Sequence, residues 1–379
     1  MTTPAGAPFE VRVTDAEIAD LRERLARTRW PEREAVDDWS QGVPLAYAQE
    51  LCAFWADGYD FRFADRINAF PQVRMDIDGL GVHALHVRSP EADALPLLLT
   101  HGWPGSVVEF LEVIGPLSDP AAHGGDPGDA FHLIVPSLPG YGWSDKPAAA
   151  GWGVPRIARA WDALVRALGY ERYGAQGGDW GASVTTTMAE QRPDGLVGVH
   201  VNMAIAAPDR SMLGDITAAE QKALDDLAAH RAMGAGYSAQ QSTRPQTLGY
   251  GLTDSPAGQC AWIAGKLWAW TDCDGHPENA LTKQQMLDDI SVYWFTATAA
   301  SAARLYWESF NSSHVGEVAV PSGISVYPRE IFRPSRRWAE QRFTDLRWFE
   351  ELDAGGHFAA WEQPESFVEQ VRGFFRLVR

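Results

Sequence analysis

The stretch Gly177-Gly-Asp-Trp-Gly181 decides the fold. It follows a predicted strand at residues 173–176 and opens a predicted helix at residues 181–192. Glycines on both sides allow a sharp strand-to-helix turn, the nucleophile elbow, which presents a reactive side chain at its tip. The alternative is a phosphate-binding or purely structural turn, because short glycine motifs are weak signals on their own.

Asp179 occupies the tip of this predicted elbow. A carboxylate is ionised at pH 7 without help from a base. It is a poor nucleophile for acyl transfer, because the mixed anhydride it would form is reactive. It is well suited to displacement at an sp3 carbon, which leaves an alkyl ester. The sequence therefore predicts a covalent hydrolase, and it excludes a serine esterase because the elbow lacks serine.

Strands and helices alternate along much of the chain on either side of the elbow. Amphipathic runs predict helices at residues 155–168 and 181–192, and a last one around residues 367–375. Such alternation is typical of a mostly parallel sheet with helices on both faces, so we expect the α/β class. The predicted strands cover residues 73–77, 82–87, 97–100, 131–135, 173–176, 197–201, 322–327 and 345–352.

Two helical segments interrupt this alternation and set the predicted domain organisation. Residues 1–72, the meander, contain a predicted helix at residues 15–28 that begins with a capping box at Thr14. Residues 205–312, the lid, are rich in Ala and Trp and give no strand signal. We expect the meander to pack on a core that consists of residues 73–204 and 313–379.

Two backbone amides are expected to form an oxyanion hole. The loop His101-Gly-Trp-Pro-Gly105 follows a predicted buried strand, and a loop in this place supplies one N–H, here from Trp103. The residue after the nucleophile supplies the other, here from Trp180. Taken alone, the loop motif could also be a structural turn.

His357 and Glu330 complete the predicted site. His357 lies after the last predicted strand in a loop with two glycines, and Glu330 follows the strand before it. The order nucleophile, acid, histidine is that of α/β-hydrolases. Asp353 is the second candidate for the acid, whereas Asn202 excludes an acid after the strand that precedes the lid.

Together these motifs resemble those of epoxide hydrolases with the α/β-hydrolase fold, in the microsomal-type branch that carries an N-terminal meander. The resemblance covers nearly the whole chain. It implies that Asp179 is the nucleophile, His357 the base and Glu330 the acid that orients it. The matching motifs are Arg29-Trp-Pro31, Asn68-Ala-Phe-Pro-Gln72, Ile77-Asp-Gly79, residues 101–106, Pro139-Gly-Tyr-Gly-Trp-Ser144, residues 176–181, Ser242-Thr-Arg-Pro-Gln-Thr247, Asp254-Ser-Pro256 and Gly355-Gly-His-Phe358.

The same resemblance implies a role for two lid tyrosines. In this family two tyrosines donate hydrogen bonds to the epoxide oxygen, and the matching positions here are Tyr237 and Tyr306. A tyrosine in a helical segment is more often a packing residue. The surrounding motifs favour these two over Tyr250 and Tyr293.

Composition and charge exclude several classes of partner. The chain has 379 residues, with 32 basic and 50 acidic side chains and a formal net charge of −18. Such an acidic chain repels nucleic acid and offers no polybasic patch to anionic lipid. No apolar run reaches 18 residues, and the first residues show no signal peptide, so we expect neither a membrane segment nor secretion. Membrane-anchored relatives carry an N-terminal helix that this sequence does not show.

The cysteines point to a reducing, cytoplasmic location. Cys52, Cys260 and Cys273 are too few and too scattered for a disulfide framework or a zinc site. The mechanism that the motifs predict needs no cofactor or metal ion. The expected partner is a small-molecule epoxide, and a homodimer is possible although no sequence feature indicates it.

The sequence thus predicts hydrolysis of an apolar or aromatic epoxide to a vicinal diol. One alternative is a haloalkane dehalogenase-like hydrolase with the same Asp and His, and another is a non-catalytic binding protein on the same fold. The natural substrate and the regio- and enantioselectivity stay open, as does the choice between detoxification and natural-product biosynthesis. The apolar substrate is suggested by five lid tryptophans, Trp262, Trp268, Trp270, Trp294 and Trp307.

Overall fold

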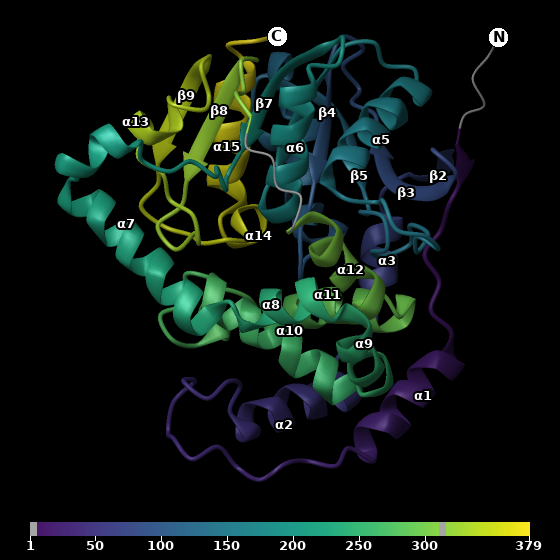
Figure 1. Cartoon of the computed structure of the whole chain (residues 1–379). Helices are drawn as coiled ribbons and strands as arrows, with labels where there is room; N and C mark the ends of the chain where they lie inside the picture. Colours follow the sequence, from purple (N-terminus) through teal and green to yellow (C-terminus); the bar gives the residue numbers. More distant parts are fainter. Residues whose placement is uncertain (1–5, 311–315) are drawn as a thin grey trace.

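A mixed sheet of nine strands forms the centre of the computed structural model, which describes residues 6–310 and 316–379 (Figure 1). The strands lie in the order β1-β2-β3-β5-β4-β6-β7-β8-β9. Neighbours from β1 to β5 pair antiparallel, and all pairs from β5 to β9 are parallel, which confirms the predicted α/β class. The strands are β1 (Ala7–Pro8), β2 (Gln72–Ile77), β3 (Leu80–Val87), β4 (Leu95–Thr100), β5 (Phe131–Pro136), β6 (Tyr173–Gly177), β7 (Leu196–Val201), β8 (Ser322–Val326) and β9 (Leu346–Glu351).

Helices cover both faces of the sheet (Figure 1). One face carries α5 and α6, and the other carries α4, α14 and α15. Strands β4 and β5 are almost wholly apolar because both of their faces are covered. These helices, with the short α13, are α4 (Leu111–Ser118), α5 (Val154–Ala167), α6 (Asp179–Gln191), α13 (Arg336–Ala339), α14 (Ala359–Glu362) and α15 (Pro364–Phe375).

In its described part, residues 205–310, the lid consists of helices joined by short loops, and no strand occurs there. It lies below the carboxyl ends of the parallel strands in Figure 1. The predicted end of the lid at residue 312 and the start of the second core part at residue 313 fall outside the described residues. Its α-helices are α7 (Ala218–Ala229), α8 (Gly236–Thr243), α9 (Pro245–Asp254), α10 (Pro256–Trp270), α11 (Lys283–Thr296) and α12 (Ala299–Ser309).

The helices of the meander pack on the lid, although the sequence placed the meander on the core. Helices α1 and α2 contact α10, whereas β1 joins the sheet, where it pairs with β2. The reason is that aromatic side chains of the meander find aromatic partners in the lid, such as Trp39 stacked on Trp268 with ring centres 4.9 Å apart. The elements are α1 (Asp15–Ala26), α2 (Leu45–Ala53), the π-helix η1 (Phe54–Gly58) and α3 (Phe63–Asn68).

Trp55, Tyr59 and Arg66 of the meander donate hydrogen bonds to helix α11, and we call these three side chains the meander–lid clamp. The Trp55 indole donates to Ser291 Oγ at 3.0 Å. The Tyr59 hydroxyl donates to Asp288 Oδ1 at 2.7 Å, and Arg66 Nε donates to Asp288 Oδ2 at 2.8 Å. The clamp therefore fixes one lid helix to a segment more than 200 residues away in sequence.

Two local predictions hold with small shifts in their limits. The capping box at Thr14 is formed, but α1 ends two residues earlier than predicted. The turn between β2 and β3 is shorter than expected, because Ile77 already pairs with Leu80. The two turn residues, Asp78 and Gly79, have φ values of 55° and 77°, as a two-residue hairpin turn requires.

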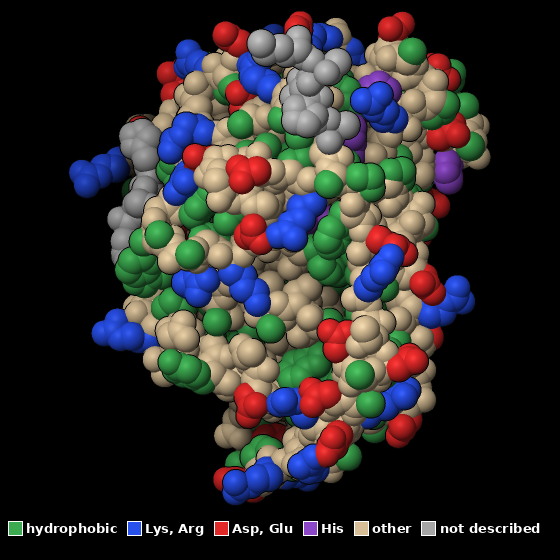
Figure 2. All heavy atoms as spheres, turned by 90° about the vertical axis from the view of Figure 1, so that its right-hand side faces the viewer, with side chains coloured by type: hydrophobic (Ala, Val, Ile, Leu, Met, Phe, Trp, Pro, Cys, Tyr) green, Lys and Arg blue, Asp and Glu red, His purple; other side chains and the backbone are tan. Residues whose placement is uncertain are grey.

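The surface carries charges of both signs. Figure 2 shows acidic and basic side chains interspersed over one face, with hydrophobic side chains singly or in small groups. Among the described residues, no helix combines the length and the apolar character that crossing a bilayer requires.

Candidate active site

The elbow between β6 and α6 holds Asp179 in a strained backbone conformation. Asp179 has a φ of 50° and is the first residue of α6. A Cβ on Gly177 would lie 2.2 Å from the carbonyl oxygen of Gly181. A Cβ on Gly181 would lie 1.8 Å from the carbonyl oxygen of Thr100. Only glycine fits at both places, so close backbone contacts hold the sharp turn around Asp179.

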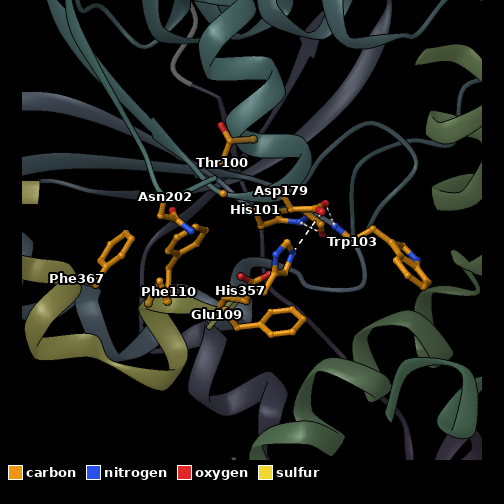
Figure 3. Close-up of a pocket in the computed structure, with 14 residues that line it drawn as sticks. Thr100, His101, Trp103, Glu109, Phe110, Asp179, Asn202, His357 and Phe367 are labelled. Atoms are coloured by element: carbon orange, nitrogen blue, oxygen red, sulfur yellow. Dashed lines mark hydrogen bonds and ion pairs between the residues drawn. The ribbon is translucent and has the colours of Figure 1, made fainter. Parts of the chain in front are cut away.

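The Asp179 carboxylate lies between the loop after β4 and His357 (Figure 3). The Trp103 N–H donates to Oδ1 at 2.8 Å, and His357 Nε2 lies 3.3 Å from Oδ2. The Trp180 N–H belongs to the first turn of α6, where N–H groups have no intrahelical acceptor. The structure thus brings the predicted nucleophile, the predicted histidine and the first predicted oxyanion donor together.

Glu330 is the acid that contacts His357. Its Oε1 lies 2.8 Å from His357 Nδ1 and also accepts from the Ile331 N–H at 2.6 Å. The His357 backbone N–H donates to the Trp270 carbonyl at 2.9 Å, which fixes the loop. Asp353, the other candidate, is exposed. The carboxylate at Nδ1 places the proton there and leaves Nε2 facing Asp179.

Two opposing effects set the pKa of His357. Burial disfavours the charged imidazolium, but the Glu330 carboxylate and then Asp179 outweigh burial and raise the pKa well above its usual value. The free site therefore favours an imidazolium between two carboxylates. Any change that removes the charge of Asp179 weakens this preference.

Tyr237 from α8 and Tyr306 from α12 lie against the ring of Trp103. Tyr237 stacks on it with ring centres 5.0 Å apart, and Tyr306 meets it edge-on at 5.8 Å. The two tyrosine rings are 5.8 Å apart. Burial raises the pKa of both phenols, and the charge of Asp179 adds to it, so both hydroxyls stay protonated.

The two other tyrosines considered from the sequence point elsewhere. Tyr250 is 72% exposed. The Tyr293 hydroxyl is buried, but it donates to the Gly105 carbonyl at 2.8 Å and supports the loop after β4.

Of the five lid tryptophans expected at the pocket, Trp270 reaches the site in the described structure. Its ring lies 5.0 Å from those of both Tyr237 and His357. The others serve different contacts: Trp268 and Trp294 pack on Trp39 and Trp55 of the meander, Trp262 donates to Gln241, and Trp307 is 47% exposed. In the described structure these four therefore lie outside the site: Trp268 and Trp294 face the meander, Trp262 faces α8 within the lid, and Trp307 faces solvent.

Two residues of the site escaped the sequence reasoning. His101 holds the loop after β4: its Nδ1 lies 2.9 Å from the Gly102 carbonyl, and its Nε2 accepts from the Leu138 N–H at 3.1 Å. Burial lowers the pKa of His101 to about 4, so the ring is neutral. Glu109 lines the cavity beside Asp179 and His357. Both stand in or next to the motif at residues 101–106, but only packing shows which way they point.

Within the described residues, no group of three or more His, Cys, Asp or Glu side chains is arranged to hold a metal ion. The groups that converge on Asp179 are hydrogen-bond donors, a histidine and aromatic rings. Such a set can stabilise an oxyanion and move protons.

Comparisons with known proteins point to one enzyme family. Residues 6–110 match the family model described as "Epoxide hydrolase N terminus", and residues 96–235 match "alpha/beta hydrolase fold". A protein of Stigmatella aurantiaca, provisionally named an epoxide hydrolase, is 53% identical to this chain. The match covers 98% of this chain and 85% of the length of that protein. Epoxide hydrolase 1 of Sus scrofa is 31% identical, and the match covers 98% of this chain and 88% of the length of that protein. The solved structure of the Aspergillus niger epoxide hydrolase has a TM-score of 0.91 and 30% identity, and the match covers 100% of this chain and 98% of that one.

Proposed function

Since this chain belongs to the epoxide hydrolase family, we propose that its Asp179 carboxylate opens the epoxide ring and forms a covalent ester. The convergence on this carboxylate of the Trp103 N–H and of His357 Nε2, at 2.8 and 3.3 Å, supports the proposal. A free carboxylate held on a strained turn attacks carbon without prior activation.

Ring opening needs a donor for the oxygen as well as a nucleophile for the carbon. One Asp179 oxygen forms the new C–O bond while the ring C–O bond breaks. Tyr237 and Tyr306 donate hydrogen bonds to the departing oxygen, and one of them gives it a proton. Both phenols are buried beside Asp179, so solvent does not compete for these hydrogen bonds.

Ester hydrolysis uses His357 and the two oxyanion-hole N–H groups. His357 first passes its Nε2 proton to the phenolate that ring opening leaves. It then takes a proton from water at Nε2, and the water oxygen bonds to the ester carbonyl carbon. The Trp103 and Trp180 N–H groups stabilise the oxyanion that forms. When the intermediate collapses, His357 protonates the departing diol oxygen. The proton released as Asp179 regains its charge returns to His357 Nε2, which restores the imidazolium and closes the cycle.

The side chains around the reacting carboxylate favour an apolar or aromatic epoxide. The rings of Trp103, Trp270 and Tyr237 contact one another, and Trp180 meets Tyr306 edge-on with ring centres 4.8 Å apart. Aromatic walls with few polar groups bind flat or apolar molecules by burial and stacking.

Oxygen labelling tests the covalent route. In a single turnover with excess enzyme in 18O water, the diol should carry little label and the peptide that contains Asp179 should become heavier. Label should pass into the product in later turnovers. A fully labelled diol in the first turnover means that water attacks the ring directly, and the ester mechanism is then wrong.

The two rival functions are separated by their products. We expect diol formation from styrene oxide and no chloride release from 1-chlorobutane. A haloalkane dehalogenase gives the opposite pattern, and a non-catalytic binding protein gives neither product. The paired phenols favour an oxygen leaving group, because an oxygen leaving group needs a proton and a halide does not.

We also propose a reducing, cytoplasmic location. The three cysteines, Cys52, Cys260 and Cys273, are all buried free thiols, which supports the proposal. A homodimer stays a prediction, which analytical ultracentrifugation would test.

A further inference from the structure

A small cavity lies behind the Asp179 carboxylate, next to His357 and the loop after β4. Its volume open to the centre of a water molecule is about 10 Å3, which is about the room that one water needs. Polar groups in its wall include the side chains of Asp179, His357, Asn202 and Glu109. A buried water makes about three hydrogen bonds, so this wall offers enough partners for one.

Glu109 reaches this cavity from the short 3-10 helix η2 (Val107–Phe110). Its Oε1 lies against Gly105, where an added Cβ would come within 1.4 Å of it. A side chain at position 105 would therefore displace the carboxyl group. Figure 3 shows Glu109 beside the His357 ring, and the two side chains interact electrostatically.

The position of the Glu109 carboxyl group is not explained by a hydrogen bond within the described residues. The spacing Ser106-Val-Val-Glu109 is that of a capping box, in which the Glu side chain bonds back to the N-cap N–H. Here the Ser106 hydroxyl caps the Val108 N–H, but the Glu109 half of the box is absent. Among the described residues, none forms a hydrogen bond or an ion pair with this carboxyl group.

We propose that the cavity binds the hydrolytic water and that Glu109 is the residue that positions it. This inference rests on the proposed ester mechanism. The water donates one hydrogen bond to His357 Nε2 and the other to a Glu109 oxygen, so that an oxygen lone pair faces the ester carbonyl carbon. Its first proton passes to His357 as the new C–O bond forms. Glu109 gains and loses no proton in the step.

The surroundings suit the Glu109 carboxyl group to accepting a hydrogen bond from water, not to taking up a proton from it. Burial raises its pKa well above the usual value, ionisation of Asp289 would raise it further, and His357 opposes this. The carboxyl group is therefore held in its neutral form, which keeps a carbonyl oxygen as acceptor. Glutamine has the same acceptor and nearly the same shape, which makes it a matched substitution.

Single-turnover kinetics test the proposal. The substrate is the epoxide turned over fastest from a panel that includes styrene oxide, and intact-protein mass spectrometry follows the ester as it forms and decays. Three variants are compared with the native protein: Glu109→Met removes the acceptor, Glu109→Gln keeps it, and Glu112→Met changes an exposed glutamate nearby. His357→Gln serves as the reference in which the ester should accumulate.

We expect Glu109→Met to form the ester within about threefold of the native rate and to hydrolyse it about tenfold or more slowly, as loss of one oriented hydrogen bond predicts. Glu109→Gln and Glu112→Met should keep most of the hydrolysis rate. An unchanged hydrolysis rate in Glu109→Met overturns the proposal, and so does an equal slowing of both steps. Equal slowing in Glu109→Gln and Glu109→Met excludes the acceptor role. If no ester forms even in His357→Gln, the covalent mechanism itself is wrong.

Discussion

At the scale of single residues, the two phenols near Asp179 are expected to share one task. Each of Tyr237→Phe and Tyr306→Phe should slow ring opening by about a hundredfold, because removing one donor from an oxyanion-type site costs about 2.7–4 kcal/mol. The double variant should nearly abolish it. Pre-steady-state alkylation rates measure this step directly. Native rates in the double variant would remove the tyrosines from the mechanism.

The charge of Asp179 should control the titration of His357. Burial lowers the pKa of His357, while Glu330 and Asp179 raise it to a net value well above normal. Asp179→Asn removes one negative charge 3.3 Å from Nε2, so the pKa of His357 should fall. NMR of labelled histidine over a pH series measures the shift, with the exposed Asp353→Asn as control. A pKa that is equal in both variants contradicts this electrostatic account.

The same effect explains how one histidine serves as base in a site that favours its charged form. Formation of the ester neutralises Asp179, which leaves Glu330 as the main neighbour that favours the imidazolium. His357 can then pass its Nε2 proton to the phenolate that ring opening leaves, and accept one from water. The first half-reaction thus prepares the base for the second.

At the scale of elements, helix α11 carries two buried carboxyl groups with opposite surroundings. Asp288 pairs with Arg66. Among the described residues, Asp289 accepts one hydrogen bond, from the Ser106 hydroxyl at 2.6 Å, and its buried carboxyl group has no cationic partner. Burial raises the pKa of Asp289 to about 8 from 3.8. The two neighbours therefore respond differently to pH and to substitution.

Asp289 should make the protein less stable as the pH rises. Its folded pKa of about 8 exceeds the unfolded value of 3.8, so the folded state binds the proton more tightly. The free energy of unfolding then falls between these two pH values, by up to about 1.4 kcal/mol per pH unit. Asp289→Asn keeps the acceptor for Ser106 and should flatten this pH dependence. Urea unfolding at pH 5 to 9 measures it, and parallel curves for the two proteins would refute the assignment.

Asp288 should matter for stability much more than an exposed aspartate of the lid. It is 7% exposed and binds Tyr59 and Arg66, whereas Asp254 is 85% exposed and pairs with Arg24. Asp288→Ala should lower the free energy of unfolding by about 3 kcal/mol, the range for a broken buried pair. Asp254→Ala should cost less than about 1 kcal/mol. Chemical denaturation measures the free energy of unfolding of both variants. If the two variants lose similar amounts, the meander–lid clamp stabilises the protein no more than an exposed ion pair does.

At the scale of the whole molecule, the lid should depend on the meander for its structure. Deletion of residues 1–71 removes the partners of Asp288 and Ser291 and uncovers the apolar face of α10. Large exposed apolar faces lead to aggregation. We therefore expect the shortened protein to be insoluble or inactive, as soluble yield and diol formation will show. A soluble, fully active fragment of residues 72–379 would contradict this.

The parts of the molecule that the sequence predicts well are those set by local chemistry. The elbow at Asp179 is specified by glycines that no other residue can replace, and the alternation of strands and helices specifies the parallel sheet. His357 and Glu330 follow from their order in the chain. The direction of Glu109 and the partners of the lid tryptophans depend on which distant segments meet. The spacing of Glu109 from Ser106 matches a capping box, of which the structure forms only the Ser106 half.

The meander–lid clamp also limits how such proteins can be recombined. The lid contributes Tyr237, Trp270 and Tyr306 to the surroundings of the site, so exchanging lids between relatives is an obvious experiment on selectivity. Trp55, Tyr59 and Arg66 are nevertheless encoded more than 200 residues before the lid helix that they hold. A chimera that takes only residues 205–312 from another protein receives the lid side of the meander–lid clamp without the meander side chains that match it. The meander and the lid must therefore be exchanged together, although residues of the core separate them in the sequence.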